Sequence, residues 1–383
     1  MNILFDARYI DQSGIGTYVK TFVAEALRRA KSKKNTNVES QNNTAGTGNF
    51  NDIAFLFARQ NKGVAWAARL KAAGYEVHWI NTVPFKIKEH AELYSILKQL
   101  RPKVFHVPHF NVPFLTPSDV IILPTVHDLA LDHYPSDFRT PLHKLYYKLN
   151  LRRTLSAPKI IVDSEFTKQD LEKVHGYKSA SLVLCGFDPE LLGAKPAKPL
   201  EDMTNVMRGR EANHLLYVGI NRMRKNLPFL IAAIADLPAE IYLSVVGDMS
   251  DWSYDIAQDV MERGLENRVH LLGRVSHEDL ARLYSTCWAL VVPSLLEGFG
   301  YPLLEAAAFG IPVASSSASS LPEVGGDGVH YFSPTDPADC RDKLLELCTS
   351  PNLAAELVER NATRPAAFRP AKFFDEMISN GRS

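Results

Sequence analysis

The chain has 383 residues, of which 46% are hydrophobic and 22% are charged. This length exceeds what one ordinary hydrophobic core needs, so two domains are expected. The 43 lysines and arginines balance the 43 aspartates and glutamates, so the bulk charge indicates no nucleic-acid partner. The four cysteines have no CxxC spacing, which argues against a zinc site and a disulfide framework. The first residues lead directly into a strand pattern without a signal peptide, so a cytoplasmic protein is expected.

Short apolar runs alternate with helical patterns through the first half, a rhythm typical of parallel α/β layers. Helices are expected over residues 17–30, 64–73 and 89–100, and the polar segment 31–52 is expected to be a surface loop. The strands expected in this half are 3–6, 53–57, 77–80, 104–107, 120–126, 160–162 and 182–184.

Two strand ends in this half carry candidate ligand-binding residues. Gly14 and Gly16 precede an expected helix, where backbone amides can face an anion, although a structural turn explains them equally well. The third glycine of the dinucleotide fingerprint is missing. His127 and Asp128 follow the run VIILPTV, at the end of a strand where ligands bind in parallel sheets. A structural histidine is an equal alternative to a functional one, and Asp128 is expected to orient the ring or hold its proton.

Lys144, Lys148 and Arg152 lie four residues apart on an expected helix and form a basic stripe, with Arg153 adjacent. An ordinary solvated face explains such a stripe. Contact with an anionic acceptor or a membrane surface is the alternative.

The strand rhythm restarts after residues 196–212, a proline-containing stretch of mixed charge that is expected to be a linker. A final amphipathic helix is expected over 371–380. The strands expected in this half are 215–218, 241–246, 269–272, 289–292, 312–314 and 329–332.

Basic residues follow the strand LLYVG. Arg222, Arg224 and Lys225 lie just beyond its end, where cationic groups can neutralise a diphosphate. A solvated basic loop is the alternative.

Residues 293–323 contain a glycine-rich turn between two carboxylates, Glu297 and Glu305. A helix is expected to start at this turn and to stop at Gly310. A helix end that binds phosphate, with carboxylates that accept hydrogen bonds from hydroxyls, suits a sugar nucleotide. The alternative is a helix that merely carries acidic residues in its first turn.

Together these segments resemble the large family of retaining, nucleotide-sugar-dependent glycosyltransferases called family four, and among them the mannosyltransferases. The resemblance runs from SGIGTYV through TVHDLALDHYP, VDSEFTKQDL, YVGINRMRKNL and LLGRVSHEDL to the block that begins PSLLEGFGYPLLEAAAFG. It implies a GT-B fold, with two Rossmann-like parallel-sheet α/β domains facing across a cleft. The implied domains are an acceptor-side domain over 1–195, the linker 196–212, a donor-binding domain over 213–365 and a helix over 366–383 that crosses back to the first domain.

The resemblance also implies roles for particular residues. Glu305 holds the ribose hydroxyls, and Glu297 holds the hydroxyls of the donor sugar. Lys225, helped by Arg224, balances the diphosphate. The backbone of Phe299, Gly300 and Tyr301 contacts phosphate and sugar, and Gly16 contacts the diphosphate. Val275 lies against the base, and His127 lies near the transferred sugar.

This chain departs from the family at Ile220, where many members have arginine; Arg222 or Arg224 can supply that charge, or it is absent. No Asp-x-Asp element for a metal stands out, so neither a metal nor a cofactor is expected.

The implied reaction transfers a hexose, with GDP-mannose as the first choice of donor and a UDP-sugar as the next. The acceptor is a hydroxyl of a glycan or glycolipid, and the protein works in the cytoplasm or at the cytoplasmic face of a membrane. The alternatives are a nucleotide-sugar epimerase or phosphorylase of the same fold, a noncatalytic sugar-nucleotide sensor and a nicotinamide oxidoreductase. The sequence indicates no oligomeric state.

Overall fold

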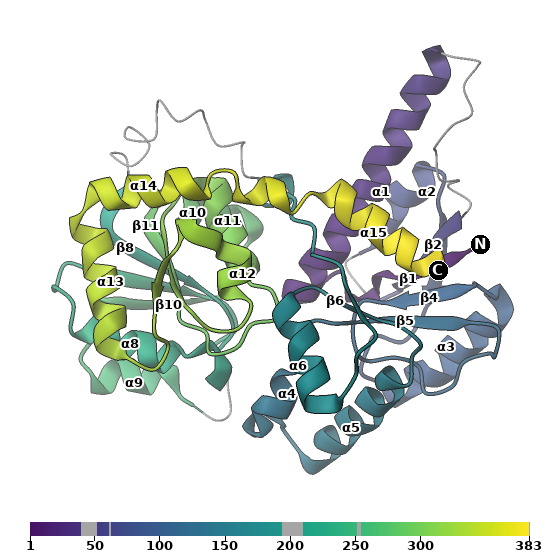
Figure 1. Cartoon of the computed structure of the whole chain (residues 1–383), viewed down its shortest axis with the longest axis horizontal. Coiled ribbons are helices and arrows are strands. Elements are labelled where there is room, and N and C mark those ends of the chain that lie inside the picture. Colours follow the sequence, from purple (N-terminus) through teal and green to yellow (C-terminus); the bar gives the residue numbers. More distant parts are fainter. Residues whose placement is uncertain (40–51, 61–62, 194–209, 251–253, 383) are drawn as a thin grey trace. The chain divides into compact units, whose positions relative to one another are not determined.

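The computed structural model describes residues 1–39, 52–60, 63–193, 210–250 and 254–382 (Figure 1). The chain forms two compact units. The first comprises Met1–His127, Arg139–Phe187 and Phe368–Ser383, and the second comprises Asp128–Phe138 and Asp188–Ala367. The predicted linker falls almost entirely outside the described residues.

The first unit contains a parallel sheet of seven strands in the order β3-β2-β1-β4-β5-β6-β7. Its central strands are buried along their whole length and are apolar except for Asp6 in β1 and His106 in β4, as expected when helices cover both faces of a sheet. The strands are β1 (Ile3–Asp6), β2 (Ile53–Ala58), β3 (Glu76–Ile80), β4 (Val104–Val107), β5 (Ile121–Val126), β6 (Ile160–Val162) and β7 (Ala180–Leu182). The helices are η1 (Ala7–Tyr9), α1 (Ser13–Glu39), α2 (Val64–Ala72), α3 (Ile87–Leu100), α5 (Pro141–Leu155), α6 (Glu165–His175) and α15 (Pro370–Arg382).

The second unit contains a parallel sheet of six strands in the order β10-β9-β8-β11-β12-β13. The strands are β8 (Glu211–Val218), β9 (Tyr242–Val246), β10 (Val269–Gly273), β11 (Cys287–Val292), β12 (Val313–Ser316) and β13 (His330–Phe332). The longer helices are α8 (Leu227–Ala235), α9 (Ile256–Glu262), α10 (His277–Thr286), α11 (Tyr301–Phe309), α13 (Pro337–Thr349) and α14 (Pro351–Asn361). The short helices are α4 (Ala130–His133), η3 (Pro135–Asp137), η4 (Pro189–Leu192), η6 (Met223–Lys225), α12 (Leu321–Gly325), η7 (Gly326–Gly328) and η8 (Arg364–Ala367).

The predicted α/β class is confirmed, and each predicted strand has a counterpart within two residues of its expected ends, except that β8 begins four residues before the predicted start at residue 215. In both sheets the chain starts in the middle, builds outward to one edge and returns to build the other. The order reverses between β1 and β4 in the first sheet and between β8 and β11 in the second. Such switch points are where open α/β sheets bind ligands, at the carboxyl ends of the strands.

Helix α15 packs against α1 within the first unit (Figure 1, yellow beside purple). The Phe374 ring stacks on Phe22 with 4.6 Å between ring centroids, and Phe373 meets Tyr18 edge-on at 4.8 Å. The apolar face of the amphipathic C-terminal helix is therefore buried against α1 through these aromatic rings.

Two local predictions about α1 are wrong. The helix begins at Ser13, so Gly14 and Gly16 lie in its first turn and do not precede it. It also continues to Glu39, although residues 31–39 were expected to be loop; this polar stretch contains neither glycine nor proline to end the helix. The rest of the predicted loop, 40–51, lies outside the described residues.

Candidate functional site

In the second unit, the predicted diphosphate and sugar ligands Lys225 and Glu297 come from the two loops at the switch point. Lys225 lies after β8 and Glu297 lies after β11, and these strands are neighbours in the sheet. The loops are also joined through the backbone, because the Leu295 amide donates to the Arg224 carbonyl at 2.7 Å. Asn226 donates from its side chain to the Pro293 carbonyl at 3.2 Å. The sheet order therefore brings together residues that are 72 positions apart in the sequence.

Lys225 and Glu297 form an ion pair, with the ammonium group of Lys225 on Oε1 of the glutamate. The Ser294 hydroxyl donates to the same oxygen at 2.8 Å. Both side chains are only slightly exposed, at 16% and 12%. Burial lowers the pKa of Lys225, and the carboxylate of Glu297 acts against that shift. A cation held in this way can receive a diphosphate if the ion pair rearranges.

Arg224 is the neighbouring cation. Its guanidinium lies 4.0 Å from Oδ2 of Asp128 and 3.5 Å from the Leu296 carbonyl. Burial acts to lower its pKa, but the nearby carboxylates of Asp128, Glu297 and Asp137 outweigh burial and raise it. Arg224 therefore stays charged, and its side chain lies against the loop that carries Glu297.

Two serine side chains of the turn before α12 form hydrogen bonds to the backbone of the turn before α11. The Glu297 amide donates to Ser319 Oγ at 2.9 Å. Ser320 donates to the carbonyls of Glu297 at 2.9 Å and Phe299 at 3.0 Å. Gly300 has a φ of 103°, and a Cβ there would lie 2.9 Å from a Leu321 side-chain carbon, so this position needs glycine.

Helix α11 begins at Tyr301, has Pro302 in its first turn and ends before Gly310, as the sequence predicted. The side chains of Phe299 and Tyr301 are buried, at 5% and 9% exposure, so what they can offer a ligand is their backbone. The positive end of the helix dipole lies at this turn.

Glu305 lies in α11 and is buried, at 7% exposure. Its Oε2 accepts a hydrogen bond of 2.7 Å from the hydroxyl of Tyr284, which α10 supplies. Burial raises the pKa of Glu305, and the Tyr284 hydrogen bond partly offsets the shift. Val275 lies in the turn before α10 and is half-buried. No sequence pattern singled out Tyr284.

In the first unit, Gly16 has a structural reason to be glycine. A Cβ at this position would lie 2.7 Å from the carbonyl oxygen of Ile10, inside the tight turn that opens α1. A Cβ at Gly14 would meet nothing within 4 Å. The structure thus explains Gly16 without a ligand, and its diphosphate contact stays a prediction.

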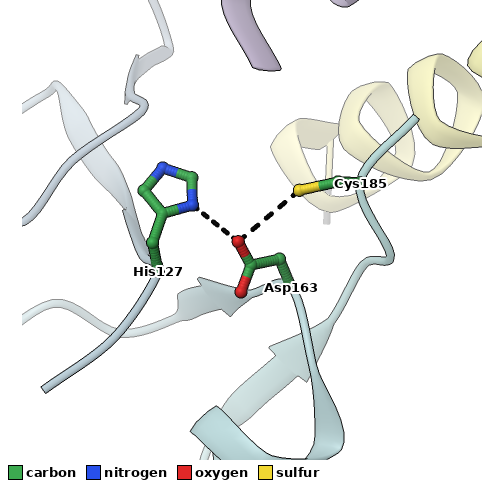
Figure 2. Close-up of side chains that lie close together, drawn as sticks. All are labelled: His127, Asp163 and Cys185. Carbon is green, nitrogen blue, oxygen red and sulfur yellow. Dashed lines mark hydrogen bonds and ion pairs between the residues drawn. The ribbon is translucent and has the colours of Figure 1, made fainter. Parts of the chain in front are cut away.

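His127 follows β5 and is hydrogen-bonded at both ring nitrogens. Nδ1 lies 2.6 Å from Oδ2 of Asp163, and Nε2 lies 3.1 Å from the Pro108 carbonyl oxygen. Cys185 Sγ is 3.5 Å from the same Oδ2, so the carboxylate stands between histidine and cysteine (Figure 2). The prediction that Asp128 orients the ring is wrong: Asp163 contacts it, whereas Asp128 Oδ1 accepts from the amide of Ala130 at 3.0 Å.

His127, Asp163 and Cys185 each offer one atom that could bind a metal ion, and these atoms all lie within 4.8 Å of one another. Nitrogen and oxygen ligands at about 2.0 Å from a tetrahedral zinc ion lie about 3.3 Å apart. The observed 2.6 Å between Nδ1 and Oδ2 is a hydrogen-bond distance. The expectation that the protein uses no metal stays a prediction.

A network of buried charged side chains lies at the carboxyl end of β1. Arg8 donates to Asp6 at 2.7 Å and to Glu89 at 2.9 Å, and all three side chains have no exposed surface. Asn111 donates to Glu89 at 2.8 Å and accepts from the Tyr146 hydroxyl at 2.7 Å. The network connects β1 with α3 and α5 through hydrogen bonds and ion pairs. Its members are far apart in the chain, so no local sequence pattern predicted it.

The matches to known proteins agree with this arrangement. The family model for Glycosyl transferases group 1 matches residues 205–364, and the model for Glycosyltransferase Family 4 matches residues 69–191. The chain belongs to this group of glycosyltransferases, as its motifs predicted.

Its curated relatives include the O-antigen chain mannosyltransferase B of Escherichia coli, which is 30% identical over 255 residues. They also include the O-antigen chain mannosyltransferase RfbU of Salmonella typhimurium, which is 26% identical over 242 residues. Each match covers 63% of this chain and 64% of the relative, which is less than two thirds of either relative's length.

Among solved structures, Anabaena HepE in complex with UDP-glucose matches with a TM-score of 0.70 at 16% identity, and the match covers 99% of both chains. A likeness at this identity shows the fold, and it is the predicted GT-B fold.

Proposed function

We propose that the protein is a retaining hexosyltransferase that moves a sugar, with mannose as the first choice, from a nucleoside diphosphate to a hydroxyl of a glycan or glycolipid. The observation that carries the proposal is the Lys225–Glu297 pair beside the glycine turn of α11, at the switch point of a sheet in a chain of this family. The names of the relatives support mannose and therefore GDP-mannose. The HepE complex supports a nucleoside diphosphate sugar in general.

In this proposal the second unit binds the donor. Glu305 accepts hydrogen bonds from the ribose, Glu297 accepts them from the sugar, and Val275 lies against the base. Negative charge grows on the departing diphosphate as the sugar becomes oxocarbenium-like. Lys225, Arg224 and the helix end at Gly300 are groups of the right sign to stabilise that charge. By analogy with the family, a departing phosphate oxygen takes the acceptor proton, so no separate base is required. The roles of Gly16 and His127 stay predictions.

The test is a thermal-shift series with GDP, UDP and ADP, followed by product analysis. A ligand at 100 times its Kd stabilises the folded state by about 2.7 kcal/mol, which is enough to rank the bases. We expect GDP to give the largest shift, and we expect GDP-mannose to be consumed with formation of an α-mannosylated acceptor. Donor binding without turnover on any acceptor would favour a sensor. An isomerised donor without an acceptor product would favour an epimerase.

We also propose that the glycolipid side of the reaction involves contact with an anionic membrane, through the outer face of α5. Leu142, Leu145 and Leu149 are 69%, 54% and 50% exposed, whereas Tyr147 and Leu151 of the same helix are buried. The basic stripe predicted from the sequence, Lys144, Lys148 and Arg152, is exposed on this helix. Exposed leucines beside cations are typical of a helix that lies in a lipid interface. Among the described helices, none is long and apolar enough to span a bilayer.

Replacing Lys144, Lys148 and Arg152 together by glutamine is expected to weaken binding to phosphatidylglycerol-containing vesicles roughly 100-fold, because each basic residue contributes about 1 kcal/mol at an anionic surface. Cosedimentation measures this effect, with phosphatidylcholine vesicles as the uncharged comparison. Replacing Lys343, Arg360 and Lys372, which lie on other helices, is the control with the same charge change. Equal vesicle binding by both triple variants would contradict the proposed surface.

A further inference from the structure

The side chain of His127 is held at both nitrogens by groups that accept hydrogen bonds. The Pro108 carbonyl, 3.1 Å from Nε2, has no proton to donate. The ionised Asp163 carboxylate, 2.6 Å from Nδ1, can only accept. The second distance is in the range of charge-assisted hydrogen bonds.

Both contacts are hydrogen bonds only if one proton lies between Nδ1 and Asp163 and another lies between Nε2 and Pro108. With a single proton on Nε2, the Nδ1 lone pair faces a carboxylate oxygen at 2.6 Å. With a single proton on Nδ1, the Nε2 lone pair faces the carbonyl oxygen of Pro108. Both arrangements place two lone pairs against each other, whereas an imidazolium beside a carboxylate places a proton in each contact. Cys185, which lies 3.5 Å from Oδ2, can donate its thiol proton to that oxygen and so favours the ionised carboxylate.

Two other titratable groups near the ring, Tyr18 and His106, carry no charge at neutral pH. Tyr18 from α1 meets the ring edge-on at 5.2 Å, and burial raises its pKa well above the ordinary value, so it is neutral. Burial lowers the pKa of His106 on β4 to about 3, so it is also neutral. Asp128, the next residue in the chain, points its carboxylate to the Ala130 amide.

The rest of the environment fixes the position of the ring. The Thr167 hydroxyl on α6 donates to the backbone carbonyl of His127 at 2.9 Å. Asp163 is 1% exposed, at the end of β6, whereas the His127 side chain keeps 18% of its surface exposed. The His127 ring therefore keeps some contact with solvent, whereas its carboxylate partner does not.

We propose that Asp163 is a positioning residue that keeps the His127 ring doubly protonated and immobile at neutral pH, so that His127 acts in sugar transfer as a fixed cation and not as a general base. A ring whose nitrogens both carry engaged protons has no lone pair with which to deprotonate an acceptor hydroxyl. The part of this inference that concerns transfer rests on the proposed function. The protonation state does not.

The decisive measurement is the ¹⁵N spectrum of the imidazole nitrogens in histidine-labelled full-length protein. The chain has 12 histidines, so the His127 signals are assigned by their loss in His127→Gln. We expect imidazolium shifts for His127 from about pH 6 to pH 8.5, well above the ordinary histidine pKa of about 6.5. In Asp163→Asn, the new amide can donate to a bare Nδ1, so the neutral ring becomes satisfied and is expected to titrate near pH 6.5.

Turnover provides the second readout. The ratio of kcat in Asp163→Asn to kcat in the wild type is expected to fall as the pH rises through about 6.5. At pH 8 the ratio should be about thirtyfold below its value at acid pH, because only about 3% of the variant molecules still carry a charged His127 ring. Asp163→Glu keeps the carboxylate and is expected to restore a flat ratio. Cys185→Ser, which keeps a donor to Asp163, should resemble wild type in its ring spectrum.

A wild-type His127 that is neutral at pH 8, or that titrates between pH 6 and 7, would overturn the inference without any variant having to fold. If the ratio of kcat in Asp163→Asn to kcat in the wild type did not change with pH, the role of His127 as a fixed cation would be overturned. If the ring is an imidazolium but no donor is turned over, the proposed function has failed and the assignment of the protonation state stands.

Discussion

Replacing Lys225 by methionine is expected to reduce kcat about 10²- to 10³-fold, the usual effect of removing one group that stabilises charge in a transition state. Lys225 is the cation that the structure places on Glu297, at the switch point of the second sheet. Methionine is unbranched like lysine and only one atom shorter, and it carries no charge. The effect is expected in kcat more than in KM, because the charge of the diphosphate grows as the bond to the sugar breaks. Steady-state kinetics with saturating acceptor measures it.

This result needs a control, because the substitution also leaves the Glu297 carboxylate without its partner. Lys225→Met/Glu297→Gln removes both charges and shows how much of the loss comes from the abandoned carboxylate. Lys343→Met, on the surface of α13, is the matched control for a lost lysine. Unchanged kcat in Lys225→Met, with the protein folded, would contradict the role of Lys225.

The pH dependence of the wild-type enzyme gives an independent check. Burial lowers the pKa of Lys225, so the free enzyme loses this cation at a lower pH than an ordinary lysine would. The alkaline limb of kcat/KM, which reports the free enzyme, is therefore expected below the ordinary lysine range. A bound diphosphate favours the ammonium form, so the limb of kcat should lie at higher pH. In Lys225→Met, both limbs should disappear.

The sequence predicted the parts of the fold that depend on local pattern. Buried parallel strands must be apolar throughout, so runs such as IAFLFA of β2 and CWALVV of β11 show up directly. Gly310 marks the end of α11 because a left-handed residue stops a helix there, with φ of 62°. The end of α1 was missed because Val38 is the one apolar residue of the stretch 31–39, and hydrophobic periodicity cannot be recognised in such a stretch.

Site residues were predicted where they belong to a motif within one loop and missed where they come from another element. Glu297 and Glu305 stand eight residues apart around one helix start. Tyr284, which holds Glu305, belongs to α10, and Asp163, which holds His127, lies 36 residues further along the chain. Proximity in sequence favoured Asp128 as the partner of His127, but the side chains that meet are on neighbouring strand ends of the sheet, β5 and β6.

Replacing Glu305 by glutamine is expected to weaken binding of the nucleoside diphosphate about 10- to 150-fold, since hydrogen bonds to a charged group contribute about 1.5 to 3 kcal/mol. Glutamine keeps the volume of this buried side chain and one oxygen for Tyr284, so the loss reports the charge. Turnover at saturating donor should change far less than in Lys225→Met. Isothermal titration of GDP measures the affinity, and Tyr284→Phe, which leaves the carboxylate in place, is the matched comparison.

Proton release distinguishes this role from a structural one. Burial raises the pKa of Glu305 in the free protein, so it begins to take up a proton at a higher pH than an ordinary glutamate does. Ribose hydroxyls donate to the ionised form and lower that pKa, so binding must release protons, and affinity must fall as the pH is lowered through the raised value. Titrations in buffers of different ionisation enthalpy count these protons. If Glu305→Gln released as many protons as wild type, the carboxylate would not be the group that receives the ribose.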